Sequence, residues 1–413
     1  MLALVVNPVA GVGGPAGLAG SDGAAVQAAA AERGARPLAG ERARVALEVV
    51  ATSLRRSRSG DGPDAHRDHA PVILTAAGPM GEDAVRAAGL EPRVVHRPGG
   101  AGAEASAFET TPADTTAAVR ALVDAGATLV LFAGGDGTAR DVAAGLDTPA
   151  AALGIPAGVK MYSPVFAVSP RAAGALAVAW AEASAAAPLP VQEREVLDID
   201  EAAMRRARVE PRLHGTMPVP YRAGRTQSRK AATPVSEHAA VVAAARGAAR
   251  AMRPGVRYLL GPGGTMAELA RELGVAKTPL GVDVVLDGRV VRAGASEHEL
   301  VDEISRGPAK AVVSVIGGQG FLLGRGNQQL SARVLRLLDD DPLLVVAPEQ
   351  KLIDLGGSPL LVDTGDPGVD ARLAGFARVI TGAATTSVYP VLAPDAEASH
   401  PTPTHTEGEG HAP

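Results

Sequence analysis

The feature that most constrains the fold of this chain is an apolar run that leads directly into a glycine-rich turn. Residues 128–133 (TLVLFA) form the clearest buried strand of the sequence, and the turn GGDGT follows at 134–138, before a helical segment. Shorter apolar runs at 2–6, 71–76 and 150–155 are also followed by loops and helical stretches. Strands that alternate with helices in this way predict a mostly parallel sheet.

The glycine-rich turn has the composition of a phosphate-binding loop with one carboxylate added. Gly134, Gly135 and Gly137 allow the backbone to approach a phosphate closely, and the helix start at Thr138 offers free amide donors. Asp136 would repel a phosphate, so its presence is explained if it holds a metal or takes a proton from an attacking hydroxyl. A tight turn with Asp136 as a helix cap is the structural alternative.

A second glycine-rich loop follows the first predicted strand. It contains Asn7, Gly11, Gly13 and Gly14, but neither the residue order of a P-loop nor the spacing of a dinucleotide fingerprint. A flexible turn is the alternative interpretation. Because ligands of open α/β sheets bind at the carboxyl ends of neighbouring strands, the two loops support each other as a phosphate site. Lys160, after the strand at 150–155, is either a phosphate-neutralising group or a solvated surface lysine.

Composition excludes several classes of function. The chain has 413 residues, 46% of them hydrophobic, which suggests two domains. A net charge of −5 argues against nucleic acid or an anionic membrane as the main partner. The absence of cysteine excludes disulfides, a thiolate nucleophile and a cysteine-ligated metal. No apolar run approaches the ~20 residues of a membrane span, and the N-terminus lacks the pattern of a signal peptide, so we expect a cytoplasmic protein.

From residue 191 onward the pattern becomes richer in strands. A predicted strand at 258–260 ends in a loop with Gly263, Gly264 and Thr265. Another at 311–316 leads to a loop that offers Arg325, Asn327 and Gln328 to a polar ligand. Turns without a ligand are the alternative for both loops. Residues 363–367 (DTGDP) indicate turn chemistry first and a Mg²⁺-binding carboxylate pair second. Residues 52–70 are polar without periodicity and predict a surface loop.

Several blocks of sequence resemble one protein family. VVNPVAGVGG, FAGGDGTARDV and LGIPAGVKMYSPVFAVSP are similar to segments of the ATP–NAD kinase superfamily. LGPGGTMAELARELG, TPLGVDVV, IGGQGFLLGRGNQQLS and DTGDP resemble a branch of it, the predicted ATP- or polyphosphate-dependent NAD kinases that include the acetoin catabolism protein X. The GGDGT motif alone is shared with diacylglycerol and sphingosine kinases, so it indicates only the superfamily.

The resemblance implies a fold and a reaction. It implies an α/β protein with a Rossmann-like parallel-sheet domain (1–155), a strand-rich α+β domain (156–391) and, from composition, a disordered tail (392–413). The implied reaction transfers phosphate from ATP or polyphosphate, with Mg²⁺, to the 2′-hydroxyl of the adenosine ribose of NAD. In that picture Asp136 deprotonates the hydroxyl, the neighbouring glycines and Thr138 hold phosphates, and the loop from Asn7 to Gly14 binds nucleotide.

The acceptor is where this chain departs from mainstream NAD kinases. Their Asn-Glu pair and their GSTAY-type segment are both absent, so we expect Gly263–Thr265 and Arg325–Gln328 to bind the ribose of NAD or NADH instead. The expected partners are these small molecules and ATP, with no nucleic acid, no membrane and a homo-oligomeric assembly. Two alternatives stay open: a kinase for a lipid or another alcohol, and a nucleotide-binding regulatory protein without catalysis.

Overall fold

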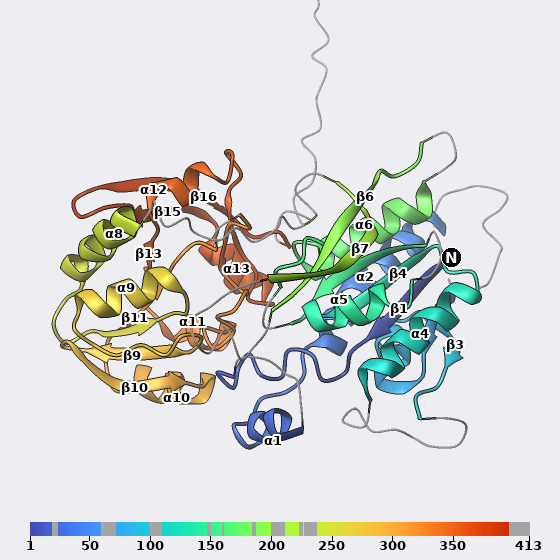
Figure 1. Ribbon diagram of the computed structural model, residues 1–413, viewed down its shortest axis with the longest axis horizontal. Coiled ribbons are helices and arrows are strands. Elements are labelled where there is room, and N and C mark those ends of the chain that lie inside the picture. The colour runs from blue at the N-terminus through green and yellow to red at the C-terminus, as the bar shows by residue number, and fades with distance from the viewer. Residues whose placement is uncertain are drawn as a thin grey trace, which may run out of the picture.

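The computed structural model describes residues 1–18, 24–58, 72–99, 110–146, 150–158, 161–183, 187–199, 211–222, 226, 238–316 and 318–395. An N-terminal half (residues 1–222) and a C-terminal half (residues 238–395), each built around its own sheet, lie side by side (Figure 1). This arrangement confirms the predicted fold class of a parallel-sheet part followed by a strand-rich part. The domain boundary expected at 155/156 stays a prediction.

The N-terminal sheet has five parallel strands in the order β3-β2-β1-β4-β5. Nearly every residue of the interior strands β1 and β4 and of the edge strand β5 is buried. This is expected when helices cover both faces of a parallel sheet. The strands are β1 (Leu2–Val6), β2 (Val72–Ala76), β3 (Glu91–His96), β4 (Leu129–Gly134) and β5 (Ala151–Pro156).

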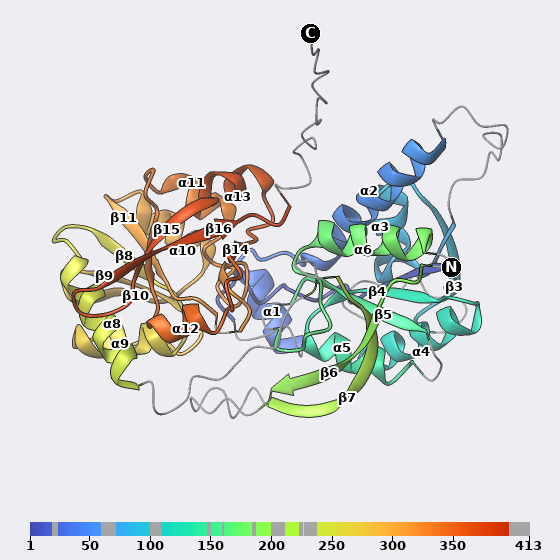
Figure 2. The same cartoon turned by 90° about the horizontal axis from the view of Figure 1, so that it is seen from above.

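Helices cover this sheet on both faces (Figure 2): α2, α3 and α6 lie on one side, and α4 and α5 on the other. The helix α1 lies between the two halves in both views. The helical segments are α1 (Ala24–Glu32), α2 (Ala39–Arg58), the 3₁₀ turn η1 (Gly78–Met80), α3 (Glu82–Ala87), α4 (Pro112–Asp124), α5 (Asp136–Ala143) and α6 (Pro170–Glu182).

The loop predicted at 52–70 is wrong over its first part. Helix α2 continues through Arg58, and only 59–71 lie outside the described residues. Its buried residues recur at the spacing of one helical face, as Ala43, Ala46, Leu47 and Val50. These buried residues pack the earlier turns of α2 against the sheet. The polar residues that follow continue the same helix.

A two-stranded antiparallel ribbon, β6 (Val191–Ile199) and β7 (Pro211–Pro220), packs against β5 and α5. Val196, Met217 and Val219 are buried in the same core as the N-terminal sheet. The first hydrophobic core therefore includes this ribbon, and it also takes in Phe321 from the C-terminal half.

The C-terminal half contains a nine-stranded mixed sheet in the order β10-β9-β8-β11-β13-β15-β16-β14-β12. Adjacent strand residues face different cores: Leu259 packs toward α10, α11 and α13, while Leu260 packs toward α8 and α9. The strands are β8 (Arg257–Leu260), β9 (Val282–Leu286), β10 (Arg289–Ala295), β11 (Ala309–Val313), β12 (Phe321–Leu323), β13 (Leu343–Val346), β14 (Leu360–Val362), β15 (Gly375–Ile380) and β16 (Thr386–Leu392). The helices are α8 (His238–Ala251), α9 (Gly264–Glu272), α10 (Glu297–Ile304), α11 (Ala332–Leu337), α12 (Glu349–Ile353) and α13 (Pro367–Leu373).

The last described residues return to the N-terminal half. After β16, the side chain of Asp395 accepts a hydrogen bond from the Ser169 hydroxyl at the start of α6. A disordered tail is predicted for 392–413, but residue 392 is the last residue of β16 and residues 393–395 are ordered against α6. The remainder, 396–413, lies outside the described residues.

Candidate active site

The carboxyl ends of β1 and β4 meet where the strand order of the N-terminal sheet reverses. In an open parallel sheet the loops after such strands diverge and leave a crevice in which ligands bind. Asn7, directly after β1, joins the two ends: its backbone N–H donates to Ala133 O at 3.0 Å, and its Nδ2 donates to Thr138 Oγ1 at 2.9 Å. The two predicted loops are therefore neighbours.

Asp136 is the first residue of α5, and its carboxylate is buried beneath the segment that follows β5. Oδ2 accepts a hydrogen bond from the Tyr162 amide at 2.6 Å, and Oδ1 accepts one from the Ser163 amide at 3.0 Å. Ser163 Oγ in turn bonds both the N–H and the C=O of Leu197 in β6, at 3.0 Å each. Burial and the nearby Asp136 charge raise the pKa of Tyr162. Asp136 thus holds the 161–163 segment, whereas the N-cap of α5 is Gly135.

Close packing leaves no room for a side chain at Gly134 of the GGDGT turn or at Gly158 after β5. A Cβ on Gly134 would lie 2.2 Å from Thr138 Oγ1, and one on Gly158 would lie 2.4 Å from Gly135 Cα. Gly134 O accepts hydrogen bonds from the amides of Ala157 and Gly158, at 3.0 and 2.8 Å. The backbone after β5 therefore lies directly on the start of α5, where the first amides of the helix have no intrahelical acceptor.

The first glycine-rich loop lies between the two halves and is largely buried. It is built from successive turns, in which Gly14 N donates to Gly11 O at 3.2 Å and Leu18 N donates to Gly13 O at 2.9 Å. Gly11 has a φ of 82°, and a Cβ there would lie 2.4 Å from Ala157 O. Several amides expected to face phosphate are thus used within the loop, and its nucleotide-binding role stays a prediction.

A pocket of about 340 Å³, here named the central pocket, lies between the two halves and falls in the size range of small-molecule sites. Gly11, Arg325 and Gln328 of the predicted site line it, as do both carboxylates of the DTGDP turn. No residue of GGDGT lines it, although Gly158, which lies against Gly135, does. The lining is Gly11, Pro15, Leu38, Arg42, Pro156, Ala157, Gly158, Met161, Glu297, Gly324, Arg325, Gln328, Leu330, Ser331, Ala332, Arg333, Asp363, Thr364, Gly365 and Asp366.

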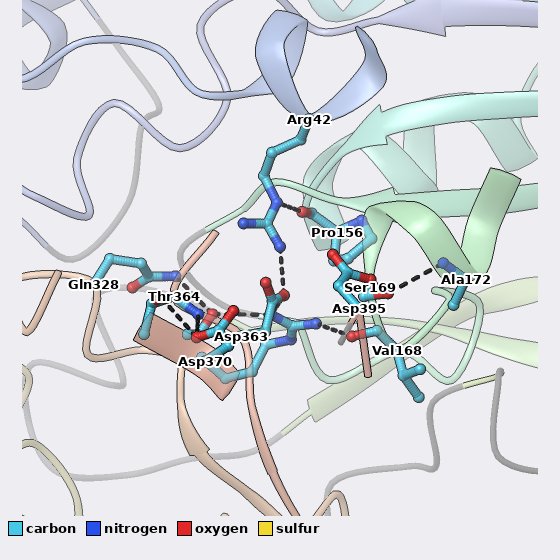
Figure 3. Close-up of polar contacts among 12 residues, drawn as sticks. Arg42, Pro156, Val168, Ser169, Ala172, Gln328, Asp363, Thr364, Asp370 and Asp395 are labelled. Atoms are coloured by element: carbon cyan, nitrogen blue, oxygen red, sulfur yellow. Dashed lines mark hydrogen bonds and ion pairs between the residues drawn. The ribbon is translucent and has the colours of Figure 1, made fainter. Parts of the chain in front are cut away.

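A buried ion-pair network crosses the central pocket (Figure 3). Arg42 of α2 donates to Pro156 O and to Asp363 Oδ2. Arg325 donates to the same carboxylate oxygen at 2.8 Å and to Val168 O at 2.9 Å. Burial alone would raise the pKa of Asp363, but the two guanidinium groups outweigh it and hold that pKa below its usual value. The network therefore carries an ionised carboxylate between the two halves.

Two further carboxyl groups lie close to this network. Asp370 accepts hydrogen bonds from the Thr364 amide at 2.9 Å and the Thr364 hydroxyl at 2.6 Å. Burial raises the pKa of Asp370 to about 7, in spite of these bonds, and the charge of Asp363 adds to the effect. Burial and the charge of Asp363 also raise the pKa of Asp395. The neighbourhood thus contains groups with opposite pKa shifts, which is typical of functional sites.

Other predicted residues do not meet at the central pocket. Asn327 is pinned within its own loop, because its Oδ1 accepts from Gly324 N at 3.0 Å and its Nδ2 donates to Leu322 O at 2.8 Å. The hydroxyl of Thr265, at the start of α9, accepts from Lys351 at 3.1 Å. Gly263–Thr265 are absent from the pocket lining among the described residues, and Lys160 lies outside the described residues.

Sequence reasoning missed Arg42, Gly158 and the role of Asp363. Arg42 lies on α2, whose first part carries no helix prediction. The DTGDP pattern predicts turn chemistry, or half of a Mg²⁺ site, for Asp363. Asp366, the other member of that pair, caps α13 by accepting from Val369 N at 2.9 Å. The helical spacing of apolar residues could have revealed α2, but no sequence signal pairs Arg42 with a residue 321 positions away.

Possible metal ligands in the described part of the chain are scattered or already bonded. No group of three or more His, Asp and Glu side chains suited to a metal ion occurs within the described ranges. Both oxygens of Asp136 accept backbone amides, and Asp363 is paired with arginines. The described part of the chain therefore holds no all-protein metal cage, and none of its helices is long and apolar enough to span a membrane.

Comparisons with known proteins identify the family. Residues 2–183 match the ATP-NAD kinase N-terminal domain, and residues 253–391 match the ATP-NAD kinase C-terminal domain. No curated protein and no solved structure is significantly similar to the chain. Two matches in the order of the family's two domains, over the two halves of this fold, show that the chain belongs to the ATP-NAD kinase family.

Proposed function

We propose that the protein is an NAD kinase, which transfers a phosphoryl group from ATP or polyphosphate to the 2′-hydroxyl of the adenosine ribose of NAD. The observation that carries this proposal is the position of GGDGT. Its Asp136 begins α5 at the point where the strand order of the N-terminal sheet reverses. This sheet lies within the residues that match the ATP-NAD kinase N-terminal domain. A helix N-terminus at such a crevice favours phosphate. The central pocket beside it supplies room for a small-molecule substrate.

In the proposed reaction a bond forms between the transferred phosphorus and the 2′-oxygen, while the bond from that phosphorus to the leaving phosphate oxygen breaks. The hydroxyl proton passes to the Asp136 carboxylate. Gly134, Gly135, Gly137 and Thr138 contribute backbone amides toward phosphate, and Gly11 and Arg325 contribute the lining of the acceptor side. Asp136 is held in place for this role by the amides of the 161–163 segment.

A divalent cation is part of the proposal, since members of this family use ATP with one. Magnesium is commonly bound through substrate phosphates with only one or two protein carboxylates. The described residues contain no cluster of three ligating side chains, so the ion would be held mainly by the substrate phosphates, whose charge it would neutralise.

The direct test is formation of NADP by the purified protein. NAD and NADH are each incubated with Mg²⁺ and either ATP or polyphosphate, and the product is quantified with an NADP-specific dehydrogenase. We expect NADP or NADPH from at least one donor, at a rate that Asp136→Asn lowers by about 10²–10⁴-fold. Folded protein that binds ATP but makes no product from any combination would contradict the acceptor assignment.

A further inference from the structure

The Asp363 carboxylate at the end of β14 has one oxygen that the protein leaves without a donor. Oδ2 receives both arginine bonds, from Arg42 and from Arg325. Oδ1 is buried, and no hydrogen-bond donor among the described residues reaches it. Buried polar atoms of folded proteins almost always have a partner, and a buried carboxylate oxygen without one is destabilising. This oxygen is therefore a vacant acceptor within the Arg42–Asp363–Arg325 network.

The vacant acceptor belongs to a residue that lines the central pocket. Asp363 as a whole is only 3% exposed, and Figure 3 shows its carboxylate facing the Arg42 guanidinium across the gap between the halves. The Nη1 group of Arg42, which also lines the pocket, makes no hydrogen bond within the described residues. The wall of the pocket therefore holds a buried acceptor and a cationic donor next to each other.

The surrounding charges determine which ligand group fits Oδ1. The guanidinium groups of Arg42 and Arg325 would repel a metal ion or an ammonium group placed at this oxygen. A neutral hydroxyl donates a hydrogen bond without that repulsion, and an ionised carboxylate can act only as an acceptor. An anionic group is favoured beside Arg42. Together these requirements describe a hydroxyl and a phosphate on one small molecule.

We propose that Asp363 accepts a hydrogen bond from a ribose hydroxyl of a nucleotide in the central pocket, with a phosphate of that nucleotide beside Arg42. This inference rests on the proposed function, whose two nucleotides, ATP and NAD, both carry ribose phosphates. Asp363 is then a specificity-determining residue, held in place by Arg42 and Arg325. Polyphosphate has no ribose, so Asp363 does not contact that donor.

The experiment compares nucleotides with their deoxy analogues by isothermal titration calorimetry. ATP is titrated beside 2′-deoxy-ATP and 3′-deoxy-ATP, and NAD beside its 2′-deoxy and 3′-deoxy forms on the adenosine ribose. In wild type we expect one analogue of one series to bind about tenfold or more weakly than its parent, because an ionised acceptor loses its donor. The series that responds identifies the nucleotide. In Asp363→Asn that ratio should fall to about twofold or less.

A matched control separates recognition from stability. Glu303 is a buried carboxylate paired with Arg306 at 2.7 Å and Arg257 at 3.5 Å, outside the pocket lining, so Glu303→Gln perturbs a similar pair and should keep the wild-type ratio. If Asp363→Asn does not fold, Asp363→Glu keeps the charge and moves the oxygen by one methylene. Nucleotides that bind wild type equally well with and without each hydroxyl overturn the inference alone. Failure of both nucleotides to bind overturns the proposed function as well.

Discussion

Asp136 has a structural role in this fold and a catalytic role in the proposed reaction. Its two oxygens hold the Tyr162 and Ser163 amides, and the proposed chemistry asks the same carboxylate to receive a proton from the acceptor hydroxyl. A substitution there changes both the chemistry and the local fold. A test of this residue therefore needs a control variant that lowers stability without changing the chemistry.

The first prediction concerns Asp136→Asn. We expect phosphoryl transfer to fall by about 10²–10⁴-fold and the free energy of unfolding to fall by about 1–3 kcal/mol, because the new amide N–H₂ faces a backbone N–H. Rapid-quench kinetics and urea unfolding measure the two effects. Ser163→Ala is the control: it removes the hydroxyl bonds to Leu197 and should lower stability while keeping the rate within about threefold. A rate of Asp136→Asn within about threefold of wild type would place the base elsewhere.

The second prediction concerns the carboxyl of Asp370, whose pKa burial raises to about 7. Between an unfolded value near 3.9 and about 7, the folded protein keeps a proton that the unfolded chain has released. The contribution of Asp370 to stability is therefore largest below about pH 4, falls as pH rises to about 7, and is constant above that. Asp370→Asn removes this titration, and its amide oxygen can still accept the bonds from Thr364.

We therefore expect the stability of Asp370→Asn, relative to wild type, to rise between about pH 4 and pH 7 and then to level off. The rise is at most about 1.4 kcal/mol per unit of pKa shift. Urea unfolding of both proteins at several pH values measures it. If the stability difference between Asp370→Asn and wild type stays constant over this pH range, the pKa of Asp370 is not raised in the folded protein.

At the scale of elements, the segment after β5 is packed so closely on the start of α5 that no side chain fits at Gly158. The turn after β5 lies on the start of α5, where Gly158 meets Gly135. The same tightness occurs at Gly154 in β5, where a Cβ would lie 2.2 Å from the Phe166 ring. These contacts set the position of the GGDGT turn, because they leave it no freedom to move toward β5.

The third prediction compares two glycines that begin or adjoin helices. Gly158→Ala places a Cβ against Gly135 Cα and should lower stability by about 1–3 kcal/mol, with weaker ATP binding, because the GGDGT turn must shift. Gly264→Ala, at the first residue of α9, meets nothing within 4 Å and should be neutral or stabilising by up to about 1 kcal/mol. Thermal unfolding and ATP titration test both. Unchanged ATP affinity in a destabilised Gly158→Ala would make this contact purely structural.

At the scale of the whole molecule, the two halves are joined by buried polar contacts. Arg42 and Arg325 share Asp363, Gln328 donates to Gly158 O at 3.1 Å, and Gln319 donates to Met161 O at 2.8 Å. The first glycine-rich loop packs between the halves as well. The relative position of the halves, and with it the central pocket, depends on these contacts.

The fourth prediction concerns Arg42→Ala. It leaves a buried carboxylate with one guanidinium instead of two, so we expect a loss of about 3–5 kcal/mol in the free energy of unfolding. Arg44→Ala, on the same helix, removes only exposed pairs with Glu41 and Glu48 and should cost less than about 1 kcal/mol. Denaturant unfolding compares the two variants. Equal losses would mean that the Arg42–Asp363 pair does not join the halves.

The sequence alone determined the layers of the fold and the position of its most informative motif. Continuous apolar runs of strand length predicted the parallel strands β1, β4 and β5. The turn between β9 and β10 is equally local, because Asp287 and Gly288 both have positive φ there. These features are local, because backbone conformation and burial period depend on residues a few positions apart. The family resemblance added the prediction of the reaction.

Only the tertiary structure decided which side chains meet at the site. It brought Asn7 to Thr138, set Asp136 beneath the 161–163 segment, and joined Arg42 to Asp363, while it left Asn327 pinned in its own loop. Such pairs lie far apart in the sequence, and each depends on how helices and strands pack along both halves. Burial then sets the energy of every charge, so the vacant oxygen of Asp363 exists only because the folded halves exclude water from it.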